Sequence, residues 1–306
     1  MNVCIKQKYS FIFLIGYLLV FSFPLFAQDY MNQTALSELL AQRAHDLDAL
    51  PTIHYRYYII KETSRLRARL RLYQRIGREN KLLIQLLNRN TLEDLQPGDT
   101  LVIPDQFVSD LRAYSPFPHY YPGAREFYKL VVIDKSLQAF AAYEYGQLVR
   151  WGIVNTGVIS NRTPNGRFNF NWKTEYKRSS LNPDWEMYWV FNFHEKRGLH
   201  IHQYAMPTGG PASHGCVRLL DADAEWLYHW ADTWTRKNGR IIKPGTTLLI
   251  IGEDIQGKPS LFDYKPAYPV LKQISLPAHP YDVPPGTDQQ RYFDKLRAAG
   301  KLSFIR

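Results

Sequence analysis

The chain has 306 residues, of which 45% are apolar and 22% charged, and its formal net charge is +10. This composition excludes a disordered chain and supplies enough apolar side chains for one main domain with smaller additions. The basic excess favours an anionic partner, whether nucleic acid, acidic lipid or a carboxylate-rich polymer.

The amino terminus predicts a signal peptide over residues 1–27. Lys6 and Lys8 precede an apolar run from Phe11 to Phe26, and Ala27 ends the segment. An uncleaved anchor and a buried helix are the alternatives, although the run is short for a bilayer span. Export to the periplasm or cell envelope is therefore expected, which argues against nucleic acid as a partner. We expect no transmembrane segment after cleavage, because no later run is long and apolar enough.

Cleavage would remove Cys4 and leave Cys216 as the only cysteine. A structural cysteine in an oxidising compartment normally has a partner. An unpaired one indicates a reactive thiol, an intermolecular bridge or a metal ligand, and the alternative is an inert buried residue.

Two segments before residue 107 have helical or strand periodicity. Residues 28–53 predict a short helical segment that Pro51 ends. Residues 54–106 predict strand, helix, helix and strand, and they end in Gln96-Pro-Gly-Asp-Thr-Leu-Val-Ile-Pro104. This order and ending resemble a lysin motif (LysM), a small α+β module that binds N-acetylglucosamine-containing glycans.

The first helix of this LysM-like module is loaded with arginines. A solvated helix face is the ordinary interpretation of such a pattern, and contact with an anionic wall polymer is the alternative. The residues are Arg65, Arg67, Arg69, Arg71 and Arg75.

Residues 107–124 are rich in proline and tyrosine, lack periodicity and are predicted to be a linker. From residue 125 to 253 the chain reads mainly as strands, at 127–133, 139–145, 148–155 and 167–172, and the first three form an antiparallel meander. A further strand, Trp185 to His194, alternates aromatic and polar side chains, and its aromatic face is predicted to be core.

A helix is predicted to begin at Asp221 as N-cap, to carry Trp226, Trp230 and Trp234 on one face, and to stop at Asn238-Gly239. A final strand is expected at 246–251. Residues 254–306 form a proline-rich tail with one predicted helix, at 288–299, and no assigned role.

Cysteine catalysis needs a nucleophilic thiol, a base within reach and donors for the oxyanion. Ser213-His-Gly-Cys216 and His200-Ile-His202 can supply all three, because glycine frees the backbone before the cysteine and the two strand histidines share a face. The alternative is a zinc site, since several possible ligands lie nearby: His194, His200, His202, His214 and Cys216. A lone thiolate beside a glycine suits a nucleophile better, so we expect neither metal nor cofactor.

Several stretches between about Arg125 and Glu253 occur in a characteristic order: Lys129-Leu-Val-Val-Ile-Asp-Lys-Ser-Leu-Gln-Ala-Phe140, Tyr145-Gly-Gln-Leu-Val-Arg150, Asn155-Thr-Gly157, Thr163-Pro-Asn-Gly-Arg-Phe168, Ile201-His202 and Ser213-His-Gly-Cys-Val-Arg218. In these stretches and their order the chain resembles the L,D-transpeptidase catalytic domain of bacterial peptidoglycan enzymes. The resemblance implies a mainly β fold, an L,D-transpeptidase-type β-sandwich with a flanking helix.

The resemblance also implies roles for residues. Cys216 would be the nucleophile and His202 the base, with His214 as the alternative base. The backbone amides of His214, Gly215 and Cys216 would bind the oxyanion. Ser213 would hold the turn, and Arg218 would anchor the loop or meet a substrate carboxylate. Candidate substrate contacts are Gln203, Tyr204, Thr163 and Trp189.

The expected function is that of an exported L,D-transpeptidase. Its partners would be peptidoglycan stem peptides and glycan strands: a tetrapeptide stem would acylate the cysteine, lose its terminal D-alanine and be passed to an amine. One alternative keeps the fold but uses water, as an L,D-carboxypeptidase or an enzyme that releases proteins from the wall. The other is a catalytically inactive wall-binding protein.

Overall fold

The computed structural model describes residues 50–179, 182, 184–204 and 209–301. The chain divides into two units, residues 1–41 and 42–306, and every described residue belongs to the second. The predicted signal peptide and residues 28–49 of the predicted helical segment lie outside the described residues. None of the described helices is long and apolar enough to cross a membrane.

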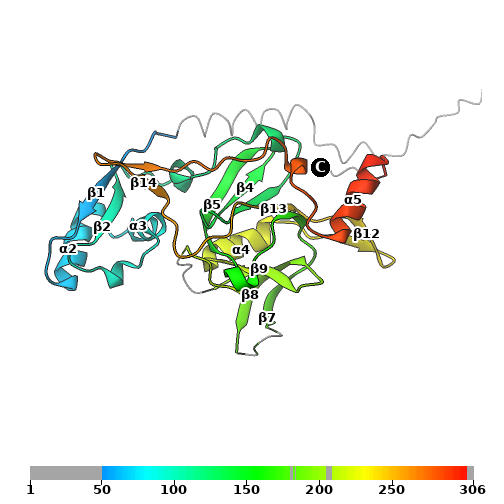
Figure 1. Cartoon of the computed structure of the whole chain (residues 1–306), viewed down its shortest axis with the longest axis horizontal. Coiled ribbons are helices and arrows are strands. Elements are labelled where there is room, and N and C mark those ends of the chain that lie inside the picture. Colours follow the sequence, from blue (N-terminus) through cyan, green and yellow to red (C-terminus); the bar gives the residue numbers. More distant parts are fainter. Residues whose placement is uncertain (1–49, 180–181, 183, 205–208, 302–306) are drawn as a thin grey trace, which may run out of the picture. The chain divides into compact units, whose positions relative to one another are not determined.

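Residues 54–106 contain the predicted order of strand, helix, helix and strand (Figure 1). Strand β1 (Tyr55–Ile59) pairs antiparallel with β2 (Thr100–Pro104), and between them in sequence come α2 (Arg65–Ile76), α3 (Lys81–Asn88) and the 3-10 turn η2 (Leu92–Asp94). Apolar side chains from all five elements and the adjoining loops form a small core. The predicted elements are confirmed, whereas the lysin-motif assignment and its glycan binding stay predictions.

One sheet of nine strands forms the main body, in the order β6-β13-β3-β4-β5-β10-β9-β8-β7. The strands are β3 (Leu130–Asp134), β4 (Ala139–Glu144), β5 (Gln147–Asn155), β6 (Gly166–Asn169), β7 (Lys173–Arg178), β8 (Glu186–His194), β9 (Leu199–Gln203), β10 (Val217–Leu219) and β13 (Thr247–Ile251). The meander β3, β4, β5 is antiparallel as predicted, while the pairs β3 with β13 and β9 with β10 are parallel.

The sheet curls so that two strands far apart in its order pack face to face. Phe170, just after β6, stacks on Phe191 of β8 with ring centroids 4.5 Å apart, and Phe168 meets Phe193 at 5.4 Å. Helix α4 (Asp221–Trp230) packs against β8 and β9. The aromatic face of the alternating strand is thus largely core, and the fold is mainly β with a flanking helix, both as predicted.

The helix after Cys216 is shorter than predicted. It ends at Trp230, because Ala231 takes extended backbone angles, and its N-cap is Leu220 instead of Asp221. Asn238-Gly239 is the turn of a hairpin between β11 (Thr235–Lys237) and β12 (Arg240–Lys243). Both turn residues have positive φ, 50° and 74°, as a two-residue hairpin turn requires. The prediction that this dipeptide stops the helix is wrong.

The segments on either side of the sheet pack into its core. Residues 107–124 form η3 (Leu111–Tyr114) and η4 (Pro122–Ala124), and they bury Tyr114 and Phe117 beside apolar side chains of the module and the tail. The tail contains the hairpin β14 (Phe262–Tyr264) and β15 (Pro269–Leu271), which lies beside β1, then η6 (Pro280–Asp282) and the predicted helix as α5 (Asp288–Ala298). The module, the sheet and the tail therefore share one apolar core.

Candidate active site

Strand pairing brings the cysteine to the two strand histidines. Cys216 directly precedes β10, which lies between β5 and β9, and the parallel register sets Val217 opposite Ile201 and Arg218 opposite His202. Cys216 is a half-buried free thiol. It lines one cavity together with His202, His214 and Arg218, so the structure unites residues that are fourteen positions apart in the sequence.

His202 is a buried, neutral imidazole with a defined tautomer. Its Nδ1 lies 2.6 Å from the carbonyl oxygen of Gln203, which can only accept, so Nδ1 carries the proton and donates it there. Burial lowers the pKa of His202 to about 4, and the positive charge of Arg218 acts in the same direction. At neutral pH, Nε2 is therefore an unprotonated acceptor, as a general base must be.

The thiol is also neutral at rest. Burial raises the pKa of Cys216 above its ordinary value, while the backbone N–H of His200 and the charges of Arg218 and Arg197 oppose this shift. The side chain of His200 makes a different contact: its ring packs edge-on against Trp172, with centroids 5.3 Å apart. Of the two histidines that share this face of β9, only His202 lines the cysteine cavity.

Ser213 ties the turn around the cysteine. Its hydroxyl accepts from the N–H of Gly215 at 3.0 Å and donates to the carbonyl of Cys216 at 2.5 Å, and the turn needs the positive φ of 111° at Gly215. The Gly215 amide is thus engaged, contrary to its predicted oxyanion role. Within the described part of the chain the amides of His214 and Cys216 donate to no protein acceptor, which leaves two candidate donors.

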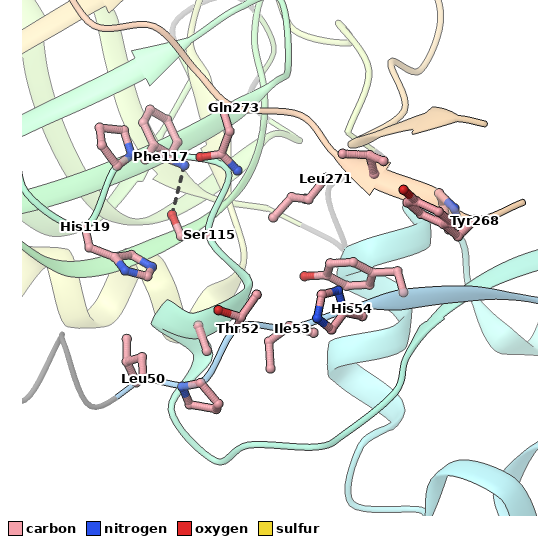
Figure 2. Close-up of a pocket in the computed structure, with 16 residues that line it drawn as sticks. Leu50, Thr52, Ile53, His54, Ser115, Phe117, His119, Tyr268, Leu271 and Gln273 are labelled. Atoms are coloured by element: carbon pink, nitrogen blue, oxygen red, sulfur yellow. Dashed lines mark hydrogen bonds between the residues drawn. The ribbon is translucent and has the colours of Figure 1, made fainter.

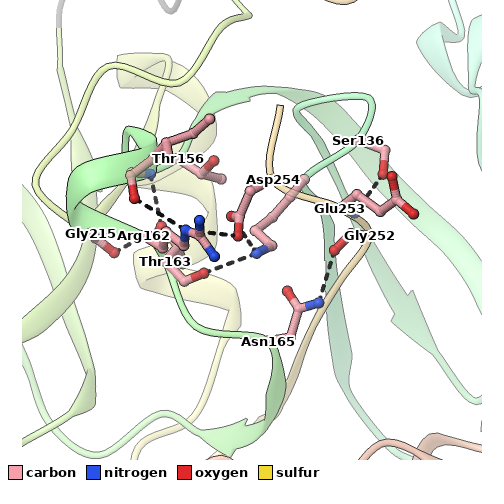
Figure 3. Close-up of polar contacts among 12 residues, drawn as sticks. Ser136, Thr156, Arg162, Thr163, Asn165, Gly215, Gly252, Glu253 and Asp254 are labelled. Carbon is pink, nitrogen blue, oxygen red and sulfur yellow. Dashed lines mark hydrogen bonds and ion pairs between the residues drawn. The ribbon is translucent and has the colours of Figure 1, made fainter. Parts of the chain in front are cut away.

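Thr163 supports the same turn through its side chain (Figure 3). It is fully buried, and its hydroxyl donates to the carbonyl of Gly215 and accepts from the N–H of Gly157, both at 2.9 Å. Its own carbonyl accepts from Lys135 Nζ at 3.1 Å, and that ammonium pairs with Asp254 at 2.7 Å. This burial favours a supporting role for Thr163 over the predicted substrate contact.

The remaining predicted residues divide between the cavity and elsewhere. Exposed His214 lies against Trp185, with ring centroids 5.2 Å apart, and the Arg218 guanidinium covers the ring of Tyr204 at 3.9 Å while donating to the Ala212 carbonyl. All of these except Ala212 line the cavity. Gln203 contributes the carbonyl that fixes His202.

Trp189 lies apart from the cavity. It packs on Tyr228 and His229 of α4, at 5.4 and 5.8 Å, which argues against a contact with substrate at Cys216. Across the described ranges no three His, Cys, Asp or Glu side chains are grouped so that they could hold a metal ion.

Two residues that support the cysteine turn, Gln138 and Thr156, were not predicted from the sequence. Gln138 is fully buried, donates to Thr156 Oγ1 at 2.7 Å and accepts from its N–H at 2.8 Å. The carbonyl of Thr156 in turn accepts from the N–H groups of Ala212 and Ser213. The Asn155-Thr-Gly157 match pointed to this place in the chain but not to these contacts.

A second cavity, of about 450 Å³, lies between the start of β1, residues 113–119 and the tail (Figure 2). Its polar groups include Thr52, His54, Ser115 and His119, and Ser115 Oγ accepts from the N–H of Phe117. The described residues that line it include no cysteine and no Asp, Glu, Lys or Arg. The free thiol of Cys216 lines the other cavity.

Residues 128–250 match the family model YkuD, the L,D-transpeptidase catalytic domain, and every residue that lines the cysteine cavity falls inside this range. None of the curated proteins matches the chain.

Several solved structures are similar to the chain. An L,D-transpeptidase from Stackebrandtia nassauensis is 23% identical, with 41% of this chain and 56% of that chain covered and a TM-score of 0.34. One from Mycobacterium smegmatis is 17% identical, with 40% and 58% covered and a TM-score of 0.33. One from Xylanimonas cellulosilytica is 23% identical, with 64% and 98% covered and a TM-score of 0.39. The chain thus spans little more than half the length of the first two.

Proposed function

Because residues 128–250 match the L,D-transpeptidase catalytic domain, we propose that the protein is an L,D-transpeptidase with Cys216 as nucleophile and His202 as base. One observation carries the assignment of the two residues. Both line the same cavity, and the bond from Nδ1 of His202 to the Gln203 carbonyl leaves Nε2 to accept a proton. His214 is exposed beside Trp185, so it suits the rim of the cavity better than the role of base.

The first half-reaction forms a thioester. His202 Nε2 takes the proton of Cys216 as Sγ attacks the carbonyl carbon of the L-centred diamino acid in a tetrapeptide stem. The amides of His214 and Cys216 stabilise the negative oxygen of the tetrahedral intermediate. When the intermediate collapses, the C–N bond to the terminal D-alanine breaks and the leaving amine takes the proton from His202.

The second half-reaction transfers the acyl group. The acceptor amine gives a proton to His202 as it attacks the thioester, a new peptide bond forms, and Cys216 regains a proton as it leaves. Both groups are neutral at rest, because burial lowers the pKa of His202 to about 4 and raises the pKa of Cys216. The proton must therefore move during attack, which makes His202 necessary at neutral pH.

The surroundings suit an anionic peptide of the cell wall. Arg197 and Arg218 both line the cavity and can meet the carboxylates of a stem peptide. We place the enzyme in the periplasm or cell envelope on the basis of its predicted leader, and we assign contact with glycan strands to the LysM-like module.

The test is a reaction of the purified protein with tetrapeptide muropeptides, followed by mass spectrometry. Wild-type protein should form 3-3 cross-links, and Cys216→Ala should form none. Cross-links from the Cys216→Ala protein would contradict the mechanism. A tripeptide without any cross-link would identify water as the acceptor and replace the transpeptidase by a carboxypeptidase. A carbapenem should add its mass to wild-type protein, and absence of that adduct would favour an inactive wall-binding protein.

A further inference from the structure

Arg89 is a residue of the LysM-like module that is buried against the sheet domain. It follows the last turn of α3 with a φ of 51°, and its side chain is 3% exposed. A left-handed conformation is uncommon outside glycine, so the chain holds Arg89 in this direction at some cost in backbone strain. Burial lowers the pKa of Arg89 to about 9, which leaves the guanidinium charged at neutral pH.

The guanidinium bridges two separate segments of the sheet domain. Nη1 donates to the carbonyl of Gly209 at 2.7 Å, and Nη2 donates to the carbonyls of Leu137 and, at 3.5 Å, Gln138. Gly209 lies upstream of the cysteine turn, whereas Leu137 and Gln138 form the turn between β3 and β4. The planar fork of an arginine can serve both segments at once, which the single ammonium of a lysine cannot.

Both segments lead to the nucleophile. The residue after Gly209 is anchored in turn, because the carbonyl of Gly210 accepts from Asn155 Nδ2 at 2.5 Å. Gln138 binds Thr156 through its side chain, and Thr156 accepts from the N–H of Ser213, the first residue of the cysteine turn. Arg89 thus holds Gly209, where the segment 209–216 that ends at the nucleophile begins. It also holds the turn that contains Gln138, whose side chain binds Thr156.

The contact between Arg89 and Gly209 requires a glycine at position 209. A Cβ atom at Gly209 would lie 2.5 Å from Cδ of Arg89, and Gly209 has a φ of 72°, so only glycine allows the arginine to approach. This close fit is a second feature, separate from the hydrogen bonds, that joins the module to the cysteine loop.

We propose that Arg89 is a positioning residue for Cys216, so that the N-terminal module is a working part of the catalytic unit as well as a candidate glycan binder. Its effect on acyl transfer rests on the proposed function, whereas its effect on the thiol does not. Loss of the Arg89 hydrogen bonds lets the segment 209–216 shift, which misplaces the nucleophile and opens the cavity.

The test compares Arg89→Met and Arg89→Lys with wild type and with Arg67→Met, which removes an exposed arginine of α2. For Arg89→Met we expect kcat of acyl transfer to fall roughly 10- to 100-fold with KM nearly unchanged, since a small displacement of a reacting group has effects of this size. Arg89→Lys should fall in between, and Arg67→Met should match wild type. An unchanged kcat in Arg89→Met would overturn the proposal.

A second measurement is the alkylation rate of Cys216 by iodoacetamide, which needs no substrate. Arg89→Met should react at least about fivefold faster than wild type, because local opening further exposes the half-buried thiol. Urea unfolding of the same protein gives the rate that global unfolding alone would cause, and an increase no larger than that would refute local positioning. If wild type forms no acyl-enzyme, the proposed function fails while this comparison still decides the role of Arg89.

Should Arg89→Met fail to fold, Gly209→Ala takes its place, because the added methyl group displaces the arginine from the opposite side. It should raise the alkylation rate in the same way, and a rate equal to that of wild type would contradict the proposal.

Discussion

The cysteine cavity and helix α2 use polar side chains in opposite ways. Beneath the cysteine turn, Thr163 and Gln138 are uncharged, fully buried and hydrogen-bonded. On α2 the five arginines are exposed or half-exposed, and one of them, Arg71, pairs with Glu62 at 3.4 Å. The charges of α2 therefore mark solvated surface, whereas neutral buried groups fix most of the cysteine turn. Two buried charges join this network: Lys135, which donates to the Thr163 carbonyl, and Arg89 of the module.

The largest effect is expected from replacing His202, and replacing His200 is the matched comparison. Both are buried on one face of β9, but His202 alone lines the cavity, and His200 offers the thiol only its backbone N–H. His202→Ala should lower kcat of acyl transfer by ~10²- to 10⁴-fold, the usual contribution of a general base. His200→Asn keeps the backbone N–H and should lose less than about tenfold by the same standard. Equal losses in the two variants, at equal folded fractions, would remove the distinction.

The pH dependence of the thiol tests whether the cavity holds neutral groups. Burial raises the pKa of Cys216, so the reactive thiolate is scarce at neutral pH and increases as the pH rises. The alkylation rate of Cys216 should therefore climb about tenfold per pH unit between pH 6 and 8, as for any thiol below its pKa. A rate that is flat over this interval would instead indicate a thiolate paired with a charged imidazole.

The buried network itself is tested by Thr163→Val, which keeps the shape and removes the hydroxyl. The carbonyl of Gly215 and the N–H of Gly157 lose their partner, so the free energy of unfolding should fall by ~1–3 kcal/mol. Acyl transfer should fall with it, because the cysteine turn is released. Thr174→Val is the control: its hydroxyl bonds to the carbonyl of Tyr176 at an exposed site, and its removal should cost less than about 0.5 kcal/mol in a urea titration.

The smallest effect is expected on the charged face of the module. Replacing Arg67 and Arg71 together by Gln should change the free energy of unfolding by less than about 0.5 kcal/mol, because exposed ion pairs contribute little. Cys216 alkylation should be unchanged. A change in alkylation as large as that expected for Arg89→Met would show that the module acts through its net charge and not through one buried contact.

Whether a site residue could be predicted from the sequence depends on whether its role follows from residue type and local spacing or from contacts made only in the folded chain. The proximity of Cys216 and His202 was expected, because strand spacing sets both histidines on one face of β9 and the family resemblance singles out His202. Their catalytic roles are proposals. Gln138, Thr156 and Arg89 were not predictable, since each acts through a partner that only the folded chain brings near. The pairing of β4 with β5 sets Gln138 beside Thr156, and the packing of the module on the sheet domain sets Arg89 against Gly209 and Leu137. A polar residue in a sequence does not show which distant carbonyl it will reach.

Parts of the fold were also left ambiguous by the local sequence pattern. The strands of the meander were predicted from β-rich composition and the turn residues between them, and the helix α5 from its periodicity. Asn238-Gly239 suited either a helix end or a hairpin turn, and the apolar spacing up to Trp234 favoured the wrong choice. The tryptophans of this stretch satisfied a helical pattern, although the chain leaves the helix at Ala231 to pair as β11 and β12.

The most direct test of Cys216 as the nucleophile is intact-mass spectrometry of the protein mixed with a tetrapeptide muropeptide, followed by peptide mapping. We expect an adduct equal to the donor minus D-alanine on the peptide that contains Cys216, released by hydroxylamine as a thioester is, and absent from Cys216→Ala. Turnover of the donor without that adduct, or the same adduct on the Cys216→Ala protein, would contradict it.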